Sequence, residues 1–241
     1  MQLHIYKNAD ELNTAFADWL VAYIQTTLQQ QERFTIALSG GSTPKKLHEL
    51  LATEAYSNKI DWAKLHFFWG DERFVPFNDE RNNAKMAFDT LLKHVPVVKE
   101  NIHVMPTENI TPEASAQQYE TLLQQYFQYT THTFDLVLLG MGDDGHTLSL
   151  FPYQPVIHDN KKWVTSLWLA SQNMYRVTLT ATLVNQSACV AFLATGEKKA
   201  TVLKEVLQGD RNVDEFPSQI IQPVKGELHW FVDEAAATLI K

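Results

Sequence analysis

The feature of the sequence that most constrains the fold is a mainly apolar run, residues 134–139, that ends in a glycine-rich turn. This turn carries Asp144 and His146 within a few residues of the run. A short apolar run bounded by glycines is typical of a strand that is buried on both faces of a parallel sheet. Ligands of open α/β sheets bind beyond the carboxyl ends of such strands. We therefore expect the polar side chains of this turn to lie at a binding site.

Strands and helices alternate along the rest of the chain. Apolar spacing predicts an amphipathic helix over residues 9–30, and Thr111 followed by proline predicts the start of another. Further runs predict strands at 34–38, 65–69, 176–180, 188–194 and 228–232, and helices from Pro44 and over 83–92, 197–207 and 233–240. This alternation predicts an α/β fold with a mostly parallel sheet and helices on both faces. We expect one domain over residues 1–241, with a lid or edge structure at 153–173.

The charge and cysteine content exclude several classes of protein. Twenty Lys and Arg against 28 Asp and Glu leave a formal net charge of -8, which argues against general binding to nucleic acid or to an anionic membrane. No apolar run approaches the length of a membrane span. Cys189 is the one cysteine and lies in an apolar run, so we expect a buried thiol in a cytoplasmic protein.

The glycines at 140, 142 and 145 also match the G-x-G-x-x-G pattern of dinucleotide-binding proteins. We reject that interpretation, because Asp143 and Asp144 would place negative charge where a pyrophosphate must bind. Pro152 also leaves little room for the long helix that should follow the third glycine. We expect no cofactor.

A second loop could form a phosphate site. Gly40 and Gly41 supply flexible backbone amides, and Ser42 and Thr43 add two hydroxyls at a helix start. Together they could hold a phosphate, although the lysine of a Walker A loop is absent. The same residues are also an ordinary way to end a strand and begin a helix.

Two further loops carry charge at strand ends. The segment Asp71, Glu72 and Arg73, taken alone, favours a solvated charge run with surface ion pairs. Lys199 lies in the first turn of a predicted helix, where the helix dipole disfavours a cation. An anionic ligand would explain this lysine, although a solvated helix end remains the alternative.

His146 is the strongest candidate for proton transfer. Imidazole accepts and returns protons near neutral pH, and its place after two aspartates in a glycine turn favours function over a structural role. The sequence contains no His-Glu-x-x-His and no Cys-x-x-Cys. We therefore expect no metal site.

Taken together, these motifs closely resemble the 6-phosphogluconolactonase family. The resemblance covers nearly the whole chain and rests on residues 38–44, 69–76, 139–152, 176–180, 196–200, 216–217 and 226–236. It implies a Rossmann-like fold and the cofactor-free hydrolysis of 6-phospho-D-glucono-1,5-lactone to 6-phosphogluconate in the oxidative pentose phosphate pathway. Leu148 stands where the family more often has alanine, and Asn82 where serine is common.

The same resemblance implies roles for particular residues. His146 matches the general base, Asp144 the neighbouring carboxylate and Arg73 the active-site arginine, and the expected substrate and phosphate contacts are Gly40, Gly41, Ser42, Thr43, Arg176 and Lys199. The expected ligand is a small sugar-phosphate lactone, and the expected assembly is a monomer or a weak homodimer.

Two alternative functions remain open. Glucosamine-6-phosphate deaminase has similar motifs, but its Asp-Gly-His motif continues to a glutamate before the proline, where this chain has Phe151. The other alternative is a catalytically silent sensor of sugar phosphates. The presence of His146, Asp144 and Arg73 together argues against a silent sensor.

Overall fold

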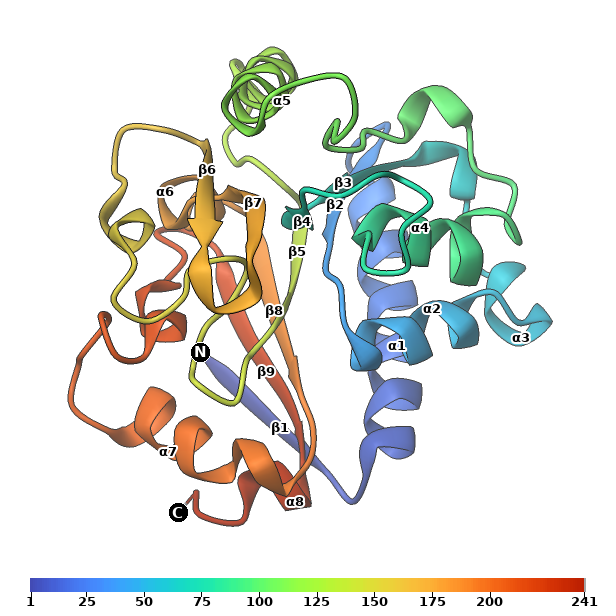
Figure 1. Ribbon diagram of the computed structural model, residues 1–241. Coiled ribbons are helices and arrows are strands. Elements are labelled where there is room, and N and C mark those ends of the chain that lie inside the picture. The colour runs from blue at the N-terminus through green and yellow to red at the C-terminus, as the bar shows by residue number, and fades with distance from the viewer. Residues whose placement is uncertain (241) are drawn as a thin grey trace.

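A six-stranded parallel sheet forms the centre of the computed structural model, which describes residues 1–240 (Figure 1). Its strand order is β1-β9-β8-β5-β2-β3, and every neighbouring pair is parallel. The strands are β1 (Gln2–Tyr6), β2 (Phe34–Leu38), β3 (Leu65–Trp69), β5 (Leu136–Gly140), β8 (Cys189–Ala194) and β9 (Glu227–Asp233). The expected α/β class with a mostly parallel sheet is confirmed, whereas the edge strand β1 was not predicted.

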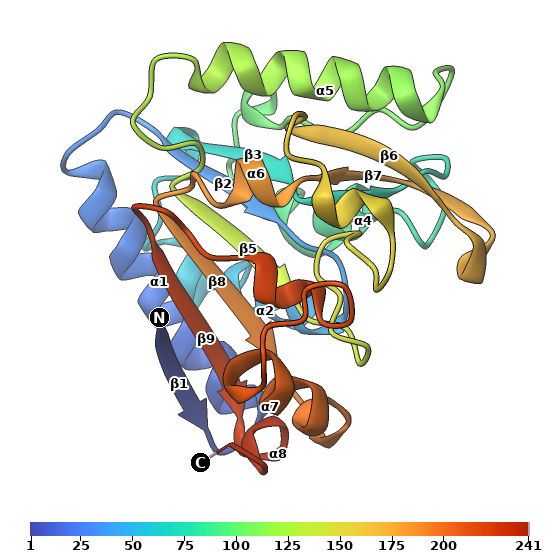
Figure 2. The same ribbon diagram turned by 90° about the vertical axis from the view of Figure 1, so that its left-hand side faces the viewer.

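Helices cover both faces of this sheet (Figures 1 and 2). Leu136 and Leu138 of β5 pack in the apolar cluster beneath α1 and α2, while Val137 and Leu139 pack in the cluster on the other face. Cys189 is fully buried on β8, as predicted. The helices are α1 (Ala9–Leu28), α2 (Ser42–Leu51), α3 (Glu54–Ser57), α4 (Asn83–Ala87), α5 (Pro112–Phe127), α6 (Ala181–Val184), α7 (Ala200–Gln208) and α8 (Glu234–Ala237).

A second, three-stranded antiparallel sheet lies beside the first. It has the order β4 (Asp71–Arg73), β7 (Met174–Leu179) and β6 (Val164–Leu169). The strand predicted at 176–180 therefore belongs to this smaller sheet, because the short turn between β6 and β7 permits only an antiparallel hairpin. The irregular stretch 153–173 contains β6, which agrees with the expected edge structure.

Three predicted helices differ from the observed elements. The helix predicted at 83–92 becomes π-helical over Phe88–Leu92, where the N–H of Lys93 bonds the carbonyl of Phe88. The helix predicted at 197–207 starts with a 3-10 turn, and the last helix ends early, at Ala237. Among residues 1–240, no helix is long and apolar enough to span a membrane.

Candidate functional site

The turn after β5 has a backbone shape that brings His146 back over the strand end. The N–H of Gly142 bonds the carbonyl of His146 at 2.8 Å, and Gly145 has a φ of 81°. A Cβ on Gly142 would lie 2.0 Å from Nδ1 of His146, so only glycine fits beneath the imidazole. The glycines thus serve to place the histidine.

His146 and Asp144 form a close pair in this turn. Nδ1 of His146 lies 2.5 Å from Oδ1 of Asp144, and the His146 ring stacks on Phe151 with centroids 4.2 Å apart. Burial raises the pKa of Asp144, but its hydrogen bonds and charge interaction with His146 outweigh this effect and lower the pKa overall. An ionised Asp144 favours the tautomer in which Nδ1 carries the hydrogen, and Nε2 of His146 is then free to accept a proton.

Two arginines face each other across neighbouring strands of the second sheet. Arg73 of β4 is in register with Arg176 of β7, so both side chains lie on the same face. Arg176 is only 3% exposed, and the Nε atoms of both arginines have no hydrogen-bond partner within residues 1–240. Burial and the neighbouring Arg73 lower the pKa of Arg176, while Asp71 opposes this. Two neighbouring cations, of which Arg176 is buried, favour an anionic group between or above them.

The hairpin that joins β6 to β7 also contributes to the site. Nη2 of Arg176 donates to Oε1 of Gln172, a residue of the short 3-10 turn at the hairpin tip. The Arg176 guanidinium also lies 6.0 Å from the centre of the Phe151 ring. No motif in the sequence pointed to Gln172.

The start of α2 lies next to the loop after β8. Gly41 precedes the helix with a φ of 108°, and no side chain caps the first turn. Backbone N–H groups of that turn can therefore bind an anion. Oγ1 of Thr43 lies 3.2 Å from Oγ1 of Thr195, just before the loop that leads to Lys199.

Lys199 itself pairs with a residue of the turn after β5. Its Nζ lies 2.5 Å from Oδ1 of Asp143, and the two residues follow the neighbouring strands β8 and β5. The loop that leads from β8 to Lys199 is held by Asp233 of β9, whose carboxylate accepts the N–H of Gly196 at 2.9 Å. Lys199 is thus fixed between the β5 turn and the start of α7.

A cavity of about 220 Å³ at the carboxyl ends of the strands brings most of the predicted residues together. Of these residues, the ones that line it are Gly40, Gly41, Arg73, His146 and Arg176. Ser42, Thr43, Asp144 and Lys199 are not part of its lining. Asp144 is linked to the cavity through its contact with His146. Ser42 and Thr43 come directly after the lining residue Gly41, and Lys199 is held by Asp143. Lining residues that the sequence did not single out as site residues include Asp71, Asn83, Phe151 and Gln172.

The interpretation of residues 71–73 as a solvated charge run is wrong. Asp71 is 8% exposed and Glu72 only 1%. Glu72 accepts backbone N–H groups of Arg73, Asn83 and Ala84 at 2.7 to 2.8 Å. Burial raises the pKa of Glu72 to about 7, against the lowering effect of these three donors. The local sequence could not reveal this burial, because α4 and the second sheet cover the segment only in the folded chain.

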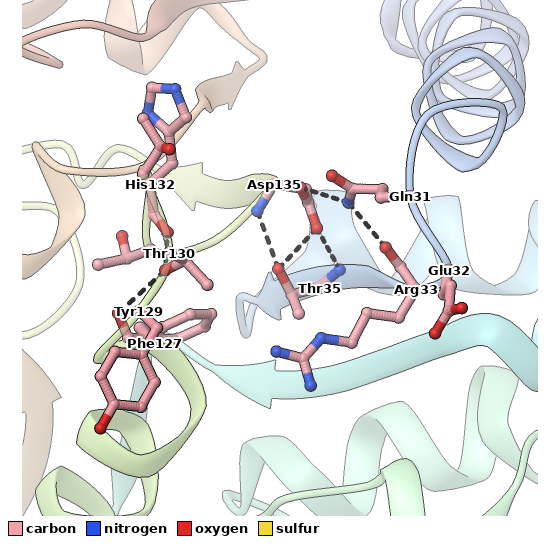
Figure 3. A pocket seen from close by; sticks show the side chains of 11 residues that line it. Gln31, Glu32, Arg33, Thr35, Phe127, Tyr129, Thr130, His132 and Asp135 are labelled. Atoms are coloured by element: carbon pink, nitrogen blue, oxygen red, sulfur yellow. Dashed lines mark hydrogen bonds between the residues drawn. The ribbon is translucent and has the colours of Figure 1, made fainter.

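A larger pocket of about 730 Å³ lies at the amino ends of β2 and β5 (Figure 3). Its polar groups bond one another: Asp135 accepts the N–H and hydroxyl of Thr35 at 2.7 and 2.8 Å and the amide of Gln31 at 2.8 Å. It contains none of the predicted site residues. Within residues 1–240, no group of three or more His, Cys, Asp or Glu could hold a metal ion.

Comparisons with known proteins agree with the sequence motifs. A family model described as glucosamine-6-phosphate isomerases/6-phosphogluconolactonase matches residues 7–230. The chain is 40% identical over 222 residues to a 6-phosphogluconolactonase of Nostoc sp., covering 91% of this chain and 90% of that protein. It is 38% identical over 205 residues to a 6-phosphogluconolactonase of Haemophilus influenzae, covering 85% and 87%. A solved structure of 6-phosphogluconolactonase from Trypanosoma cruzi superposes with a TM-score of 0.87 at 26% identity, covering 100% of this chain and 97% of that one.

Proposed function

Because the chain belongs to the family of glucosamine-6-phosphate isomerases and 6-phosphogluconolactonases, we propose that it hydrolyses 6-phospho-D-glucono-1,5-lactone to 6-phosphogluconate in the oxidative pentose phosphate pathway. The observation that carries the proposal is the His146–Asp144 pair, which lies at a cavity lined by two arginines whose Nε atoms have no partner within residues 1–240. Relatives that bear this activity in their names match over most of their length.

In the proposed reaction, His146 acts as the general base. Its Nε2 takes a proton from a water molecule as the water oxygen bonds to the lactone carbonyl carbon. The bond from that carbon to the ring oxygen then breaks, and the imidazolium returns the proton to the ring oxygen. Asp144 orients the imidazole and stabilises its transient positive charge, which agrees with the 2.5 Å contact at Nδ1.

The two arginines have a different role in this reaction. Negative charge develops on the carbonyl oxygen during the attack, and donors that are already fixed in place stabilise it most effectively. The Nε atoms of Arg73 and Arg176 have no partner among residues 1–240 that they would have to give up. We assign the oxyanion to Arg73 and a substrate contact to Arg176.

The substrate phosphate is assigned to the region around the start of α2. Ser42 and Thr43 offer hydroxyls and open backbone amides there, and Thr195 links this turn to the loop of Lys199. Lys199 is held by Asp143, which the phosphate would replace as its partner. No cofactor and no metal takes part in the proposed reaction.

Replacing His146 tests this proposal. His146→Gln should lower kcat by about 10²- to 10⁴-fold on freshly generated phosphorylated lactone, because the amide cannot accept a proton. The assay follows 6-phosphogluconate formation, corrected for spontaneous opening of the lactone. The matched control, His94→Gln, changes an exposed histidine and should keep wild-type rates.

Unphosphorylated gluconolactone should be a far poorer substrate in the same assay. Near wild-type turnover by His146→Gln would contradict the assignment of His146 as the general base. Equal rates on both lactones would remove the phosphate site, and ammonia release from glucosamine 6-phosphate would favour the deaminase.

A further inference from the structure

Asp71 is a buried carboxylate in the cavity that the proposed reaction does not use. It lies on β4 two residues before Arg73, so its side chain is on the same face of the strand as the two arginines. It lines the cavity and is only 8% exposed.

Only one of its two carboxylate oxygens is bound within the protein. Oδ2 accepts the hydroxyl of Ser149 at 2.7 Å, and Ser149 is itself fixed by the hydroxyl of Thr178 on β7, which accepts its N–H at 3.2 Å. No hydrogen bond within residues 1–240 reaches Oδ1, which is not among the fully buried atoms that lack a partner. The carboxylate is therefore held in one orientation with one oxygen left for a ligand.

A structural ion pair does not account for this carboxylate. Arg176 is near enough for a charge interaction with Asp71, yet no ion pair involves Asp71 within the described residues. The unused oxygen can accept a hydrogen bond from a molecule that binds in the cavity lined by Asp71. The phosphate cannot supply one, because it carries negative charge.

We infer that Asp71 binds a ring hydroxyl of the substrate and so determines which way the lactone lies in the cavity. This inference rests on the proposed function. Sugar hydroxyls donate well to carboxylates, and a carboxylate repels the phosphate end of the same molecule. Asp71 thus favours the orientation in which the phosphate lies near Lys199 and the carbonyl carbon lies near His146 and the arginines.

The test combines a variant of the protein with variants of the substrate. Asp71→Asn keeps the size of the side chain but weakens its hydrogen bond to a hydroxyl. The substrates are 6-phosphogluconolactone and its 2-deoxy, 3-deoxy and 4-deoxy analogues, each followed as kcat/KM. Asp71→Asn should lower kcat/KM on the full lactone by about 10- to 100-fold. The wild type should already turn over one of the deoxy analogues poorly. On that analogue, kcat/KM of Asp71→Asn should be less than about threefold below the wild-type value.

The pattern across substrates separates binding from a structural role. A loss of equal size on all four substrates, or no loss on the full lactone, would overturn the inference while leaving the proposed function intact. Absence of turnover by the wild-type protein would overturn both.

Two further variants control for misfolding of Asp71→Asn and for a general effect of removing one negative charge. Asp61→Asn removes an exposed carboxylate that pairs with Lys64 outside the cavity and should leave all four values unchanged. Ser149→Ala leaves the Asp71 carboxylate in place but frees its orientation, and it should reduce the discrimination against the same deoxy analogue. If Asp71→Asn does not fold, unchanged discrimination by Ser149→Ala would overturn the inference.

Discussion

Phe151 connects the two sides of the site at the scale of single residues. One face of its ring stacks on His146, and the guanidinium of Arg176 lies 6.0 Å from its centre. The position just before Pro152 therefore carries an aromatic support for the imidazole in this chain, where the deaminase motif has a carboxylate. Phe151 is a positioning residue, since it acts through His146 and Arg176.

Phe151→Leu should lower kcat/KM on the phosphorylated lactone by about 5- to 400-fold. The estimate combines roughly 0.5–1.5 kcal/mol for the ring stack with about 0.5–2 kcal/mol for the cation–π contact. The loss should appear in both kcat, through His146, and KM, through Arg176. Phe77→Leu, which removes a ring contact to Phe88, is the control. Wild-type kinetics in Phe151→Leu would show that the contacts of the Phe151 ring do not contribute to catalysis.

At the scale of elements, Glu72 joins β4 to the start of α4. Its two oxygens accept three backbone N–H groups, including those of Asn83 and Ala84 in the first turn of the helix. An acidic side chain at a helix N-terminus also interacts favourably with the helix dipole. The strand that holds Asp71 and Arg73 is thereby fixed to the helix that covers it.

Glu72→Gln should lower the free energy of unfolding by about 1–3 kcal/mol. One oxygen becomes an NH₂ group that opposes a backbone N–H, so a buried donor loses its acceptor. Urea unfolding measures the change. The matched control, Glu80→Gln, alters an exposed carboxylate that pairs with Lys85 and should stay within about 0.5 kcal/mol of the wild type. A Glu72→Gln protein as stable as its control would mean that the carboxylate does not hold α4.

At the scale of the whole molecule, the apolar layer between α1, α2 and the sheet contains a fully buried histidine. His48 has no exposed surface, its Nε2 has no partner within residues 1–240, and its Nδ1 lies 3.3 Å from the hydroxyl of Thr90. Burial lowers the pKa of His48 to about 4. Its ordinary value in an unfolded chain is about 6.5. At pH values between about 4 and about 6.5, His48 therefore binds a proton more readily in the unfolded chain than in the folded protein.

The protein should lose stability as the pH falls through this window. Between about pH 7 and about pH 5, His48 alone should lower the free energy of unfolding by about 2 kcal/mol, because stability falls where the unfolded state binds more protons. His48→Leu should remove that part of the pH dependence in urea unfolding at several pH values. The same slope in His48→Leu and wild type would rule out His48 as its origin.

The sequence by itself determined every strand of the parallel sheet except β1, and it predicted five of the residues that line the candidate site, namely Gly40, Gly41, Arg73, His146 and Arg176. Apolar runs marked β2, β3, β5 and β8, and because parallel strands end at one edge, the loops that follow them met there. The glycine turn after β5 also placed His146 beside Asp144, since both lie within one local segment. Local patterns suffice for such features because their geometry depends on neighbouring residues.

Only the tertiary structure decided how the charged loop after β3 is used. Its short strand β4 pairs with β7, about a hundred residues away in the sequence, and this pairing buries Asp71 and Glu72 and sets Arg73 opposite Arg176. Gln172 reaches the same cavity from the tip of the β6–β7 hairpin, and the sequence has no motif at that tip. Burial and cross-strand register arise from contacts between distant segments, so no local pattern of residues could have fixed them.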